Sequence, residues 1–126
     1  MSVEAACKAI QKEHGLARAP ALRLARATVA TMPGDPPTKA IVAEARHLMR
    51  RVSQGKRIHP IGSGLRFQHQ SDAILRTFRD RGEEYEGKEA RARANAMTAR
   101  QMRDAYGDDY VQFLSARGRQ AARGGS

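Results

Sequence analysis

The chain has 126 residues, which is room for one compact domain and little more. Its 23 basic residues, of which 18 are Arg and five are Lys, exceed its 13 acidic residues and give a formal net charge of +10. A charged fraction of 29%, with no apolar run near the ~18 residues of a membrane span, argues against a membrane protein. The charge suggests a polyanionic partner, although GC-rich coding by itself also enriches Arg, Ala and Gly.

The first residues lack the basic-then-apolar order of a secretory signal, so we expect a cytoplasmic protein or one carried within a virus particle. Aromatic residues make up only 5% of the chain and Trp is absent, so the core must rest on aliphatic side chains, Met and Ala. Such a core buries little area per helix and predicts modest stability or completion by a partner. Cys7 has no second cysteine to pair with and is predicted to be a core residue.

Apolar spacing predicts three helices in the first half of the chain, over residues 3–14, 20–32 and 36–53. Gly15 and Gly55 follow the first and third helices as natural stops. Asp35 fits the cap of the third helix, and Pro36 fits its first turn.

Residues 55–70 are rich in glycine and change the pattern. Apolar residues at alternate positions, such as Leu65 and Phe67, are typical of a strand, whereas Pro60 disfavours one. We expect a Gly-rich loop over this segment, with a small hairpin as the alternative.

A fourth helix is predicted to begin after Ser71 or Asp72 and to run to about residue 86. Gly87 either breaks it or is passed by an Ala-rich continuation at 89–97, and propensity favours continuation.

Thr98 and Gln101 then form a capping box, which predicts a helix start near residue 99 and an end at Gly107. A short helix after Asp108 or Asp109 completes an all-α bundle of five or six helices, a single domain over 1–116. The Arg/Gly-rich tail, 117–126, is predicted to have no structure of its own.

Positive charge is concentrated in the basic half, 1–66, where residues 8–66 hold twelve Lys or Arg against three acids. In the mixed-charge half and tail, 67–126, eleven basic residues face nine acidic ones. Guanidinium groups bind phosphate in a bidentate manner, so this half predicts a phosphate-contact surface, with an ordinary solvated face as the alternative. The candidate nucleic-acid contacts are Arg23, Arg26, Arg46, Arg50, Arg51, Lys56, Arg57 and Arg66. The candidate accessory contacts in the tail are Arg117, Arg119 and Arg123.

Other chemistry finds little support in the sequence. His59 and His69 flank the Gly-rich loop, but two histidines do not make a metal site, and we expect them to be polar loop residues without metal or cofactor. The Gly62–Gly64 segment matches neither a nucleophile elbow nor a phosphate-binding loop, so no enzyme is predicted. A helix-turn-helix interpretation fits poorly, since consecutive prolines interrupt the turn and base-contacting Asn or Gln is missing from the third helix.

Two functions remain from the sequence. The first is a small non-enzymatic protein that binds the phosphate backbone of DNA or RNA, mostly without sequence specificity. The second is a structural or adaptor subunit of a larger assembly, such as a phage virion component, or an inhibitor that docks on an acidic protein. Size and Arg/Ala-rich style are like those of many small phage-encoded proteins, and both functions leave room for a homo-oligomer.

Overall fold

The computed structural model describes the backbone of residues 2–124 and the side chains of residues 2–120. Within this range the chain forms helices and no strand, which confirms the all-α prediction. The six helices are α1 (Ser2–His14), α2 (Arg18–Ala30), α3 (Thr38–Ser53), α4 (Gly64–Asp80), α5 (Gly87–Tyr106) and α6 (Asp108–Gly124). None of these helices is long and apolar enough to cross a membrane.

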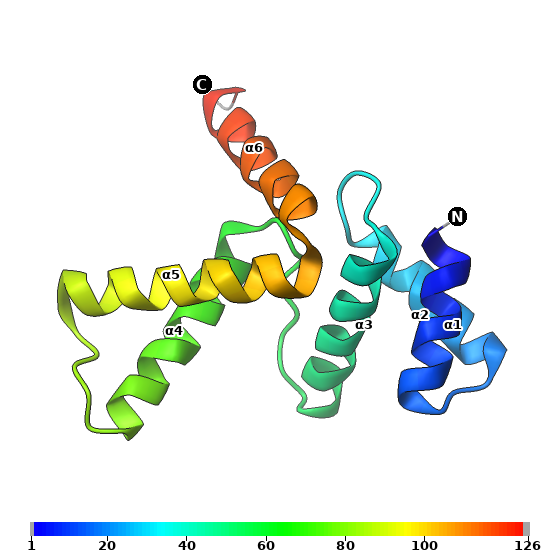
Figure 1. Ribbon diagram of the computed structural model, residues 1–126, viewed down its shortest axis with the longest axis horizontal. Helices are drawn as coiled ribbons and strands as arrows, with labels where there is room; N and C mark the ends of the chain where they lie inside the picture. The colour runs from blue at the N-terminus through cyan, green and yellow to red at the C-terminus, as the bar shows by residue number, and fades with distance from the viewer. Residues whose placement is uncertain (1, 125–126) are drawn as a thin grey trace.

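The helices fall into two groups that meet at α3 (Figure 1). α1 and α2 pack against one side of α3, while α4 and α5 form a helical hairpin on its other side. The C-terminal end of α5 returns to α3, and α6 then leads away from the body of the molecule. α3 is therefore the wall that both groups share.

The core is divided in the same way. One cluster joins α1, α2 and α3 through small side chains around Cys7 and Ile10, as predicted for Cys7. A second, central cluster includes Ile41 of α3 and Tyr106 of α5. A third, small cluster around Phe78 holds α4 to α5. The hairpin thus has a core of its own and depends on the central cluster for its attachment to α3.

The ends of the first three helices mostly follow the predicted signals. Gly15, directly after α1, and Gly55, two residues after the end of α3, adopt positive φ angles of 65° and 64°, where a residue with a side chain would be strained. The predicted cap at Asp35 is wrong, because α3 begins at Thr38 after Pro37. Pro37 is itself extended, with ψ of 160°, and it disfavours the helical conformation at Pro36, so the helix starts only after both prolines.

The predicted loop or hairpin over 55–70 is wrong in its second part, because α4 begins at Gly64. The Ser63 side chain caps the helix by accepting a hydrogen bond from the Arg66 backbone N–H at 3.2 Å. The alternation of Leu65 and Phe67 that resembled a strand is therefore part of a helical turn, in which Leu65 is exposed and Phe67 half-buried. A local cap outweighed a short alternating pattern.

α4 also ends earlier than predicted, at Asp80, and it does not continue across Gly87. Gly82 adopts a positive φ of 75° after the helix. In this conformation the Gly82 N–H donates to the Arg79 carbonyl, and the Glu83 N–H donates to the Phe78 carbonyl. This pair of bonds is a Schellman motif, which closes a helix and turns the chain.

The predicted helix start near residue 99 is wrong as well, because Thr98 lies in the middle of α5. Its hydroxyl is buried and donates to the Ala94 carbonyl one turn back at 2.8 Å. The predicted end at Gly107 is confirmed, and α6 starts at Asp108.

α6 is longer than the short helix that the sequence predicted, and it takes in residues 117–124 of the expected tail. Side chains beyond residue 120, Arg123 among them, lie outside the described residues, as does the backbone of residues 125 and 126. The accessory role of the tail stays a prediction.

Candidate functional site

A cleft of about 410 Å³ opens between α3, the segment after it, α4 and the end of α5. We call it the basic cleft. Arg and Lys contribute six of its lining side chains, His three and Gln three, and none of the described acidic side chains lines it. The polar lining residues are Arg46, His47, Arg50, Arg51, Gln54, Lys56, His59, Arg66, His69, Gln70, Arg76, Gln101 and Tyr106.

Helical spacing brings these side chains together. Arg46 and Arg50 are one turn apart on α3, and Arg51 lies beside them. On α4, Arg66, His69 and Arg76 lie on one face, at intervals of three and seven residues. These faces of α3 and α4 both line the cleft. A different side of α4, which carries Ile74 and Phe78, packs against α5.

The cations of the cleft differ in what holds them. Arg46 is paired with Glu13 of α1, its Nε donating to Oε1 at 2.9 Å, and Arg51 donates to the backbone carbonyl of Arg57 at 2.8 Å. Among the described residues, Arg50, Lys56 and Arg76 form no ion pair. Like charges in one cleft repel unless an anion lies between them, so these three side chains favour an anionic ligand.

The floor of the cleft is a buried ion pair. The Arg66 guanidinium donates to both carboxylate oxygens of Glu44, at 2.9 and 2.6 Å, and also to the His59 carbonyl. The Tyr106 hydroxyl accepts from Arg66 at 2.7 Å and donates to Glu44 at 3.0 Å. Burial opposes the charge on Arg66, but the hydrogen bond to Glu44 and the neighbouring Tyr106 and Glu44 outweigh it and raise the Arg66 pKa. The network ties α3, α4 and α5 together.

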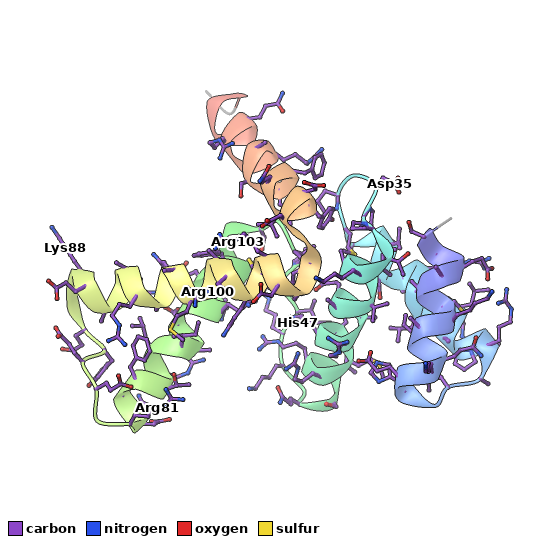
Figure 2. All side chains as sticks on the ribbon, in the orientation of Figure 1. Asp35, His47, Arg81, Lys88, Arg100 and Arg103 are labelled. Carbon is purple, nitrogen blue, oxygen red and sulfur yellow. The ribbon has the colours of Figure 1, made fainter. Side chains whose placement is uncertain are left out.

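Three histidines line the walls. His59 and His69 stack on each other, with ring centroids 4.2 Å apart and an angle of 20° between the rings. His47 lies on the side of α3 that faces α4 and α5 (Figure 2). Partial burial, with the positive charge of Arg66 as the next cause, lowers the pKa of His47 from 6.5 to about 4, so this ring is neutral at pH 7.

The structure divides the predicted contact residues. Four of them, Arg46, Arg50, Arg51 and Lys56, line the basic cleft as exposed or half-buried side chains. Arg66 is only 3% exposed and belongs to the buried network, so it supports the cleft instead of offering a free guanidinium.

The other predicted contacts lie elsewhere. Arg57 is exposed outside the cleft lining, and its backbone carbonyl holds Arg51. Arg23 and Arg26 are exposed on α2, which packs on the opposite side of α3 from α4 and α5 (Figure 1). Of the tail residues, Arg117 and Arg119 lie on α6 outside the lining.

Sequence reasoning missed the far wall of the cleft, formed by Arg76, Gln101 and Tyr106 together with the His pair. The signal that was available is the helical spacing from Arg66 through His69 to Arg76. The predicted loop over 55–70 hides this spacing, because it separates Arg66 and His69 from the helix that carries Arg76. Gln101 and Tyr106 could not be found this way, since they join the site only through the return of α5 to α3.

A second groove, of about 550 Å³, differs in charge. We call it the acidic groove, and its charged lining residues among those described are Asp35, Asp108, Asp109 and Lys39. Tyr110 and the exposed Phe113 supply its aromatic wall.

The described residues contain no group of three or more His, Cys, Asp or Glu side chains placed to hold a metal ion. In comparisons with known proteins, no family model, no curated protein and no solved structure matches this chain.

Proposed function

We propose that this protein binds nucleic acid through the phosphate backbone, with the basic cleft as the contact surface, and that it acts as a binding protein and not as an enzyme. The observation that carries the proposal is the convergence of five solvent-reaching cations on one cleft, in which the described lining residues include no acidic side chain. These cations are Arg46, Arg50, Arg51, Lys56 and Arg76.

The five cations share one cleft, and charges within about 8–10 Å of each other reinforce a common potential at physiological salt. A single small anion would neutralise only part of this charge, whereas a chain of phosphates can contact successive cations and release its own counterions. Glu13 and the Arg57 carbonyl orient two of the guanidinium groups before a ligand arrives.

The test is a salt titration of binding, measured by fluorescence anisotropy with labelled oligonucleotides. Five neutralised phosphates give a slope of log affinity against log salt of about −3.5 on a single strand and about −4.5 on a duplex. The double variant Arg50→Glu/Arg76→Glu should lower affinity at least about tenfold and flatten the slope by about two.

The matched control is Arg23→Glu/Arg26→Glu, which makes the same change in net charge on two exposed residues of α2. It should reduce affinity far less if the cleft is the contact surface. Equal effects of the two double variants would show that net charge and not the cleft governs binding. Absence of binding at low salt would overturn the proposal.

The acidic groove favours a second candidate, a subunit that assembles with copies of itself. Its three Asp side chains complement the cations of the basic cleft, and Phe113 offers an exposed apolar contact. Size-exclusion chromatography with light scattering, without nucleic acid, separates the two candidates. A stable oligomer that is lost in Asp108→Lys/Asp109→Lys supports assembly, and a monomer contradicts it.

A further inference from the structure

The stacked pair His59–His69 differs from the Arg and Lys side chains of the basic cleft because it presents aromatic rings. His59 comes from the segment between α3 and α4, and His69 from the first half of α4, so the fold brings them together from two elements. Neither imidazole makes a hydrogen bond or an ion pair to another described residue. His69 is exposed and His59 half-buried, and both line the basic cleft.

The two stacked rings present an aromatic surface within the basic cleft. Loss of hydration at the His59 ring lowers its pKa below 6.5, and His69 and Arg57 lower it further. Arg and Lys side chains surround the pair in the same cleft. Stacking platforms for bases beside phosphate-binding cations are the features by which proteins hold unpaired strands.

The volume of the basic cleft limits the size of a ligand that can contact the His59–His69 pair. A volume of about 410 Å³ suits a ligand unit of small-molecule size, such as a nucleotide, within the usual range for binding pockets of about 300–1,000 Å³. In a duplex the base faces are covered by neighbouring bases, whereas a single strand can turn a base outward. The amide groups of Gln54, Gln70 and Gln101 line the same cleft and can donate to or accept from a base edge.

We infer that the basic cleft takes a single-stranded nucleic acid, one base of which stacks on the His59–His69 pair while the adjoining phosphates contact Arg50 and Arg76. This inference rests on the proposed function and narrows its ligand. DNA and RNA share the required chemistry, so both belong in the test.

The experiment compares affinities at one salt concentration for probes of about ten nucleotides. The probes are oligothymidylate, oligouridylate, a duplex of equal length, and an oligonucleotide of abasic sites that keeps the phosphates and removes the bases. Single strands should bind about tenfold tighter than both the duplex and the abasic probe. Thymidylate against uridylate then distinguishes DNA from RNA.

Variants of the pair supply the second readout. His59→Ala/His69→Ala should weaken single-strand binding about tenfold and leave the salt slope unchanged, because it removes stacking and no phosphate contact. His59→Phe/His69→Phe, which keeps two aromatic rings, should restore most of the affinity. Circular dichroism and thermal unfolding check that each variant is folded.

The outcomes separate this inference from the proposed function. Duplex or abasic probes that bind as tightly as single strands, or an Ala variant that binds as tightly as wild type, would overturn the single-strand inference while phosphate binding stands. Polyglutamate that competes as well as the oligonucleotides would point to an acidic protein partner and overturn it too. No binding to any probe would remove the proposed function itself.

Discussion

The Glu44 carboxylate is fully buried and accepts three hydrogen bonds, two from Arg66 and one from Tyr106. Removing one partner of a buried pair leaves an uncompensated charge, which typically destabilises a protein by about 3–5 kcal/mol. We expect Glu44→Gln to lower the free energy of unfolding by that order, measured by urea denaturation. Glu13→Gln, which removes the exposed partner of Arg46, should change it by no more than about 1 kcal/mol.

The double replacement Glu44→Leu/Arg66→Met provides the control for this prediction, since it removes both charges at once. It should cost less than Glu44→Gln alone, because no buried charge remains. If Glu44→Gln and Glu13→Gln were equally mild, the pair would not be holding the helices together.

His47 predicts a dependence of stability on pH. Its pKa is 6.5 in the unfolded chain and about 4 in the folded protein, so the unfolded chain takes up the proton first as pH falls. The stabilising contribution of the neutral His47 ring to the free energy of unfolding is complete above about pH 6.5. It declines as the pH falls toward 4 and is lost below pH 4. Because the ring is only half-buried, the loss should be about 1–2 kcal/mol, less than the full shift implies.

The measurement is urea unfolding of wild type and His47→Gln between about pH 7.5 and pH 4. Other groups titrate in both proteins, so the difference between the two curves isolates His47. Parallel curves would contradict the assignment.

At the scale of the elements, Ser63 decides where α4 begins and thereby which residues face the cleft. Its side chain satisfies the Arg66 N–H, and loss of such a cap costs about 1 kcal/mol. We therefore expect Ser63→Ala to lower the free energy of unfolding by about 1 kcal/mol, with a larger change in amide exchange at the start of α4. Ser53→Ala, at the end of α3, is the control and should have a smaller effect, since its hydroxyl donates to a carbonyl in an exposed turn. A Ser63→Ala variant as stable as wild type would contradict the role of the cap.

The elements also show which local signals can be trusted. Glycines at helix ends, such as Gly15 and Gly55, act through backbone conformation alone, and the sequence placed them correctly. The prediction of a helix start at the Thr98 capping box was wrong because α5 is continuous and buried through this position. Inside a helix the backbone N–H groups that such a box would cap are already bonded to carbonyls one turn earlier. The glycine signals at these two helix ends were therefore reliable, whereas the capping box was a signal that tertiary packing overrode.

At the scale of the whole molecule, the net charge of +10 is distributed by the fold and not by position along the chain. Arg23 and Arg26 of the basic half lie on α2, away from the cleft, while Arg76 of the mixed-charge half forms its far wall. The acidic groove collects Asp35, Asp108 and Asp109 from distant parts of the chain in the same manner. A count by halves therefore identified the charge but not the surface that uses it.

The sequence by itself determined the all-helical class, most helix ends marked by glycine, and the cluster of Arg46, Arg50 and Arg51 on one helix. These follow from spacing within one helix and from backbone conformation, which are local properties. Only the tertiary structure buried Arg66 against Glu44, stacked His59 on His69 and brought Arg76 into the same cleft as Arg50. Such contacts depend on how α4 and α5 pack against α3, and that packing results from non-local burial that no local pattern records.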